Sequence, residues 1–120
     1  MNKEELLVGY KNYNPFTKEK NADPSTFYGL WEKAGRPKWF KVKPMEWYEK
    51  YSFVGRVRCY CNSFTPEMSK YCGKIVEFFE FKSKSLMEIR VFGAWQGWCM
   101  DMFSDYYLED PRMNENYELE

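Results

Sequence analysis

KIVEFFEF, residues 74–81, alternates between two faces and decides the fold class of this 120-residue chain. Val76 and Phe78 fall on one face of the stretch, and Phe79 and Phe81 fall on the other. A period of two is the pattern of an extended strand, because successive side chains of a strand point to opposite sides of a sheet. The stretch therefore predicts a β-strand.

The same period of two appears on either side of this strand. SFVGRVRCYC, residues 52–61, places Phe53 and Cys59 on one face, and LMEIRVFGAW, residues 86–95, alternates in the same way. The dipeptide Gln96-Gly97 suits a two-residue hairpin loop. Strands with one apolar face and one mixed charged and aromatic face predict an antiparallel meander. Its outer face should carry pairs among the charged residues Arg56, Arg58, Glu80, Glu88 and Arg90.

A helix is expected upstream of the sheet, in the stretch DPSTFYGLWEKAGRP. Asp23 can accept hydrogen bonds from the free amides of a helix start, and Pro24 follows where its missing N–H costs nothing. Gly35 can adopt the left-handed conformation that ends a helix, and Pro37 prevents continuation. These signals predict a helix over residues 24–34.

Further short elements are expected before the sheet. KWFKVKP, residues 38–44, reads as a strand that places Lys43 on the same side as Trp39. Residues 44–51 can form a helical turn after their leading proline, and residues 3–13 have partial helical spacing. The sequence thus predicts an α+β fold, in which N-terminal short helices pack on an antiparallel meander sheet of four to five strands.

The length suits one domain, which we expect to cover residues 1–108. Residues 109–120 are polar and acidic, and we expect them to form a mobile tail. The net charge is zero, but residues 33–58 hold eight basic and two acidic side chains, whereas residues 101–120 hold one basic and seven acidic ones. This asymmetry indicates an electrostatic partner, or a tail that folds over its own basic face.

The chain gives no sign of export or of membrane insertion. Its first ten residues, MNKEELLVGY, contain no apolar segment of the kind found in secretory signals, and no apolar run approaches the length of a membrane span. We therefore expect a cytoplasmic protein without a membrane partner, whose thiols are reduced.

RVRCYC, residues 56–61, places two cysteines one residue apart; ten residues then separate Cys61 from Cys72, and 26 separate Cys72 from Cys99. Four cysteines can close a tetrahedral zinc site, but structural zinc sites use C-x2–4-C spacing rather than C-x-C. A redox pair would use C-x-x-C. We therefore expect no metal and no cofactor. Cys59 and Cys61 read as small core residues of a strand, and a zinc site formed by all four cysteines is the alternative.

Catalytic groups are scarce in this composition. The chain contains no histidine, which removes the commonest general base and every Ser-His or Cys-His dyad. It also lacks the glycine-rich motifs that cradle phosphates. Carboxylate pairs such as Glu77 with Glu88, or Asp101 with Asp105, are more often solvated charges than a catalytic pair. We therefore expect a binding protein rather than an enzyme.

Aromatic residues make up 21% of the chain, more than a small core readily holds. Because rings supply much of the binding energy at interfaces, we expect some to contact a partner. We favour a small protein-directed inhibitor or regulator of a nucleic-acid-handling complex, in the style of phage and mobile-element proteins that block host defences. Its acidic end would imitate phosphates; core tryptophans and a merely solubilising tail are the alternatives. The candidate residues are Trp95, Trp98, Asp101, Asp105, Tyr106, Tyr107, Glu109 and Asp110.

A surface for single-stranded nucleic acid is the alternative function. Such surfaces stack bases on rings while cations follow the phosphates. The balanced net charge counts against strong nucleic-acid affinity, and the same residues also fit core rings beside a solvated basic face. The candidates are Lys38, Trp39, Lys41, Lys43, Arg56, Arg58 and Tyr60.

Overall fold

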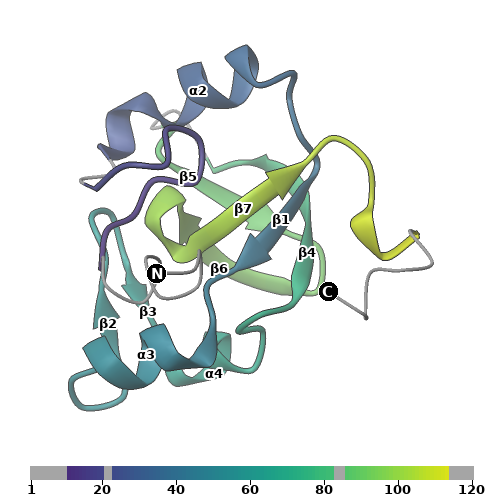
Figure 1. The fold of residues 1–120 in the computed structure, drawn as a ribbon. Helices are drawn as coiled ribbons and strands as arrows, with labels where there is room; N and C mark the ends of the chain where they lie inside the picture. Colours follow the sequence, from purple (N-terminus) through teal and green to yellow (C-terminus); the bar gives the residue numbers. More distant parts are fainter. Residues whose placement is uncertain (1–10, 21–22, 83–85, 114–120) are drawn as a thin grey trace.

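Five antiparallel strands form the main sheet of the molecule (Figure 1). The structure, a computed structural model, describes residues 11–20, 23–82 and 86–113. Within these ranges the strands follow the spatial order β6-β5-β4-β1-β7. Their bounds are β1 (Trp39–Val42), β4 (Ile75–Phe81), β5 (Glu88–Val91), β6 (Ala94–Cys99) and β7 (Phe103–Tyr107).

Three short α-helices accompany the sheet in the described part of the chain, which confirms the α+β fold class. None of these helices is long and apolar enough to cross a membrane. The helix expected within residues 3–13 falls mainly on residues 1–10, which lie outside the described residues. The helices are α2 (Phe27–Lys33), α3 (Met45–Tyr51) and α4 (Pro66–Ser69), and single 3-10 turns are η1 (Pro24–Thr26), η3 (Met100–Met102) and η4 (Pro111–Met113).

Helix α2 lies close to where the sequence predicts it. The Asp23 carboxylate accepts a hydrogen bond of 3.0 Å from the Ser25 amide at the start of η1, and Gly35 follows α2 with a φ of +94°. Phe27 is fully buried, and its ring centroid lies 5.2 Å from that of Phe81 on β4. The helix therefore covers the inner face of the sheet at β4.

The link between β6 and β7 forces the sheet to curl. These strands are the two edges of the sheet, yet only the three residues of η3 separate Cys99 from Phe103. An extended chain of that length spans about 14 Å, whereas the edges of a flat five-stranded sheet lie about 19 Å apart. The sheet closes instead, and the Trp98 ring on β6 stacks on the Phe103 ring on β7, with centroids 5.7 Å apart and an interplanar angle of 14°.

A second sheet, of two strands, packs against the same core. Strand β2 (Val57–Arg58) pairs antiparallel with β3 (Ser63–Phe64). Phe64 is fully buried between the rings of Trp47 and Trp98, at centroid distances of 5.0 and 5.9 Å. The core is thus a continuous series of ring contacts from α3 to α2, in the order Trp47, Phe64, Trp98, Phe103, Phe40 and Phe27.

The long strand predicted over residues 52–61 is wrong. Only Val57–Arg58 is paired as a strand, and it pairs with β3 rather than with the main sheet. Just before it, Val54 and Gly55 have positive φ values of 53° and 80°, and backbone hydrogen bonds between Phe53 and Arg56 close a tight turn. Phe53 is therefore 83% exposed at this turn instead of facing inward.

The hairpin loop predicted at Gln96-Gly97 is also wrong. The turn between β5 and β6 is made by Phe92 and Gly93, and the φ of Gly93 is +84°. Gly97 lies inside β6, where a Cβ atom would collide with the carboxylate of Glu88. Its small size permits close packing rather than a turn.

Substituting the two tryptophans of β6 tests the aromatic core. Trp98 is fully buried, so we expect Trp98→Ala to lower the free energy of unfolding by about 3–5 kcal/mol. Trp95 is 60% exposed, so Trp95→Ala should change the free energy by less than about 0.5 kcal/mol. Urea denaturation followed by far-ultraviolet circular dichroism measures both. Equal effects of the two substitutions would contradict the core assignment.

Candidate functional site

Three exposed rings meet on the outer face of the sheet. We call Phe79 of β4, Phe92 of the β5–β6 turn and Trp95 of β6 the outer aromatic patch; they are 42%, 49% and 60% exposed. The Phe79 ring centroid lies 4.9 Å from that of Phe92 and 5.4 Å from that of Trp95, in edge-to-face geometry. Val91 and Ala94, which pair across the turn, are buried. Phe92 and Trp95, the next residues along each strand, therefore point outward.

A β-bulge places Phe79 and Phe81 on opposite faces of the sheet. Simple alternation places Phe79 and Phe81 on one face, but the register between β4 and β5 shifts between Phe78 and Glu80. Phe81 consequently packs inside the core, whereas Phe79 contacts Trp95 outside. No residue type in this stretch signals the extra position, so the sequence did not predict Phe79 as part of a surface.

An open hollow of about 430 Å³ lies beside Trp95. The Tyr71 hydroxyl donates a hydrogen bond of 3.0 Å to the carbonyl of Gly93, and the Lys70 ammonium lies 5.3 Å from the Tyr71 ring centroid. The side-chain oxygen of Gln96 is buried and accepts no hydrogen bond within the described residues. The outer aromatic patch therefore continues into a hollow with a cation on its rim, lined by Lys70, Tyr71, Gly93, Ala94, Trp95 and Gln96.

Charged side chains of β4 and β5 pair with each other near the patch. The Arg90 guanidinium lies 3.9 Å from the Glu80 carboxylate, as alternation predicts, and the Lys82 ammonium lies 3.5 Å from the carboxylate of Glu88. Exposed pairs of this kind contribute about 0.2–1 kcal/mol each. The pairs place charges of both signs on β4 and β5, so these strands do not present the uniformly basic surface that a phosphate chain favours.

Two residues expected to face a partner are buried instead. Trp98 is fully buried in the aromatic core, and Asp101 is only 1% exposed. The Asp101 carboxylate accepts hydrogen bonds from the Asn12 side-chain amide at 2.7 Å and from the backbone amide of Tyr60 at 3.2 Å. The expectation of exposure is wrong for both, because Trp98 packs on the rings of Phe64 and Phe103 and Asp101 lies in the buried turn η3. Trp95 is exposed and belongs to the patch.

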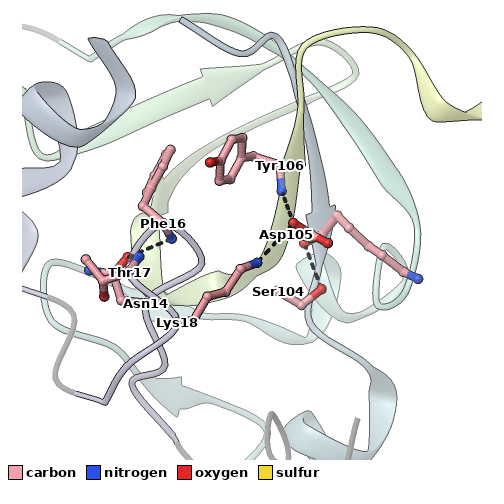
Figure 2. Close-up of polar contacts among 8 residues, drawn as sticks. Asn14, Phe16, Thr17, Lys18, Ser104, Asp105 and Tyr106 are labelled. Carbon is pink, nitrogen blue, oxygen red and sulfur yellow. Dashed lines mark hydrogen bonds and ion pairs between the residues drawn. The ribbon is translucent and has the colours of Figure 1, made fainter. Parts of the chain in front are cut away.

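Asp105 and Tyr106 of β7 contact the loop that precedes α2 (Figure 2). The Lys18 ammonium lies 3.2 Å from the Asp105 carboxylate. The Phe16 ring stacks on the Tyr106 ring at a centroid distance of 4.7 Å, and the Phe16 amide donates a hydrogen bond to the Asn14 side chain. Both residues are therefore engaged within the protein and lie apart from the outer aromatic patch.

The remaining acidic and aromatic candidates lie at the start of the expected tail. Tyr107 is half-buried and pairs with Trp39 of β1, and Glu109 is exposed. The Asp110 carboxylate lies 3.0 Å from the Arg112 guanidinium, which in turn lies 5.4 Å from the Trp39 ring centroid. Residues 114–120 of the expected tail lie outside the described residues.

The basic and aromatic candidates for nucleic acid are divided between the two sheets. Lys43 is fully buried, so the expectation that it lies on the exposed side with Trp39 is wrong. Lys43 lies just past the end of β1 at Val42, where strand alternation no longer applies, and its amide donates a hydrogen bond of 3.0 Å to the carbonyl of Met102. The other candidates are exposed or half-buried: Lys38, Trp39 and Lys41 at β1, and Arg56, Arg58 and Tyr60 in or beside β2.

Lys43 belongs to a buried polar cluster with Asp101 and Cys59. Its ammonium donates a hydrogen bond of 3.0 Å to the carbonyl of Lys11 and lies 5.2 Å from the Trp47 ring centroid. Burial lowers the pKa of Lys43 to about 8, and the charge of Asp101 partly opposes this shift. Burial and the nearby Asp101 carboxylate raise the pKa of the Cys59 thiol. The cluster therefore holds its ionisable groups out of contact with solvent.

The four cysteines are free thiols. Burial raises the pKa of the Cys72 thiol to about 12, and the charge of Glu46 acts in the same direction. Among the described residues, no group of three or more histidine, cysteine or acidic side chains is arranged to hold a metal ion. The four thiols therefore do not form the zinc site considered from the sequence.

Comparison with known proteins adds no functional assignment. No protein-family model matches the chain, and no curated protein or solved structure matches it.

The buried Lys43 makes stability depend on pH. Its folded pKa of about 8 lies below the ordinary 10.5, so between these values the unfolded chain holds a proton that the folded chain has lost. The free energy of unfolding should therefore rise with pH in this window, by about 3 kcal/mol relative to the Lys43→Met variant. Urea denaturation of both proteins from pH 7 to 10.5 measures the difference between their free energies of unfolding. Both proteins contain the same thiols, so the effect of thiol titration largely cancels in this difference. A difference that stays constant with pH would contradict the assignment.

Proposed function

We propose that this protein acts by binding another protein through the outer aromatic patch, without catalysing a reaction. The observation that supports this proposal is the mutual contact of Phe79, Phe92 and Trp95, which are 42–60% exposed. Rings that already hold one another in place lose little conformational freedom on binding. Aromatic residues are also prominent among the few side chains that dominate interface energies.

The placement of the ionisable groups favours binding over catalysis. Lys43 has a lowered pKa but is fully buried, and its ammonium is hydrogen bonded to the Lys11 carbonyl. Asp101 is buried, and its carboxylate accepts a hydrogen bond from the Asn12 side chain. Neither group lines the hollow beside Trp95, where a small molecule would meet the patch.

As the partner we propose a component of a nucleic-acid-handling complex, which the protein would inhibit or regulate. The acidic balance of residues 101–120 supports this narrower role. Asp101 is buried, however, and Asp105 and Asp110 bind cations of the same chain. Imitation of phosphates would therefore rest on the exposed Glu109 and on the last acidic residues of the sequence, Glu115, Glu118 and Glu120.

Affinity capture with matched variants tests the proposal. The wild-type protein, immobilised as bait, should retain a specific protein from a host-cell extract. The double variant Phe92→Ala/Trp95→Ala should bind the purified partner at least about 30-fold more weakly, the loss expected for one interfacial hot spot. Phe53→Ala removes a ring that is 83% exposed on a different element, so it should bind like the wild type. Calorimetry with the purified partner measures the three affinities.

Oligonucleotide binding distinguishes the alternative function. Lys43 is buried and the other basic candidates lie on two sheets, so we expect at most weak binding to labelled single-stranded DNA or RNA. Tight binding that weakens steeply with added salt would favour the nucleic-acid alternative. Capture of the same partner by the wild type and by Phe92→Ala/Trp95→Ala would overturn the proposed surface.

A further inference from the structure

Cys61 and Cys99 lie side by side although 37 residues separate them in the sequence. Cys61 is in the loop between β2 and β3, and its thiol donates a hydrogen bond of 3.5 Å to the carbonyl of Met87. The next residue, Glu88, is the strand partner of Cys99 at the end of β6. Both cysteines therefore lie beside the same end of β5, and the neighbouring Asn62 side chain donates a hydrogen bond of 3.2 Å to the carbonyl of Gly97 on β6.

The two thiols differ in their access to solvent. Cys99 is fully buried, and its hydrogen bond with Cys61 and its burial raise the pKa of its thiol. Cys61 is half-buried and is the more accessible member of the pair. Such a pair has the roles that thiol–disulfide exchange needs, because an accessible sulfur reacts first and a neighbouring sulfur resolves the intermediate.

We propose that Cys61 and Cys99 form a thiol–disulfide site that closes by exchange with a small-molecule disulfide such as oxidised glutathione. The Cys61 sulfur attacks one sulfur of the reagent, which forms a mixed disulfide and releases one reagent thiol. The Cys99 thiol then loses its proton and its sulfur attacks the Cys61 sulfur, which breaks the mixed disulfide and releases the second reagent thiol; because the pKa of Cys99 is raised, this second step is the slower one. The two protein thiols give up two electrons and two protons in total, and these convert one reagent disulfide into two thiols.

A disulfide between Cys61 and Cys99 would link the loop of the two-stranded sheet covalently to β6, an edge strand of the main sheet. The described contacts between the β2–β3 loop and β6 include the hydrogen bond of 3.2 Å from the Asn62 side-chain amide to the Gly97 carbonyl. Cys99 also directly precedes η3, where the Asp101 carboxylate accepts the Tyr60 amide. A disulfide here would restrain a loop of nearly forty residues in the unfolded chain, so oxidation should raise the melting temperature by about 5–15 °C.

Mass spectrometry of the full-length protein tests the site. After treatment with oxidised glutathione, the wild type should lose the mass of two hydrogen atoms, and a non-reducing peptide map should join the peptides of Cys61 and Cys99. Cys99→Ser should instead stop at a glutathione adduct on Cys61, whereas Cys61→Ser should form no such crosslink. Cys72→Ser is the matched control, because Cys72 lies elsewhere, and it should close as the wild type does.

Three outcomes would overturn the proposal. They are a stable glutathione adduct on Cys61 of the wild type, a disulfide that uses Cys59 or Cys72, and no reaction under conditions that oxidise a free dithiol peptide. Circular dichroism of each variant before oxidation establishes that it is folded. The rise in melting temperature should occur in the wild type and in Cys72→Ser and be absent from Cys61→Ser, and it should reverse with a reducing agent.

Discussion

The three-residue link between β6 and β7 is the constraint on which the rest of the structure depends. It joins the two edges of a five-stranded sheet, so the sheet curls until the edges meet. The stacked rings of Trp98 and Phe103 fill the contact that results. Phe64 from the second sheet and Phe40 from β1 then extend the ring contacts in both directions. Close packing of this kind makes the core sensitive to the loss of any one ring.

Curling also decides which rings remain outside. A curled sheet encloses its inner face, and the rings on that face, such as Phe81 and Phe78, pack against α2. Rings on the outer face point away from this core, and the Phe79 ring contacts the rings of Phe92 and Trp95 there. A contiguous exposed aromatic group on a small domain is commonly an interaction surface. The proposed binding function is thus linked to the same constraint that shapes the core.

Local sequence signals predicted local structure well and long-range structure poorly. The capping residues around α2 and the alternation over residues 74–81 report on neighbours in the chain, so they located a helix and the central strand. The β-bulge that places Phe79 and Phe81 on opposite faces depends on the partner strand, and the sequence of one strand does not contain it. Of the residues predicted to bind a partner, only Trp95 lies in the outer aromatic patch, because exposure is set by how the edges of the sheet meet.

The same link explains why ionisable groups gather inside the molecule. The short link carries Asp101 into the interior, where its carboxylate accepts hydrogen bonds from Asn12 and Tyr60 and lies near Lys43. A buried charge pair adds little net stability, but the loss of one partner is costly. The pair therefore acts to hold distant segments against η3. Cys99 directly precedes this link, and Tyr60, whose amide Asp101 binds, directly precedes Cys61, so the link brings distant cysteines together without any spacing motif.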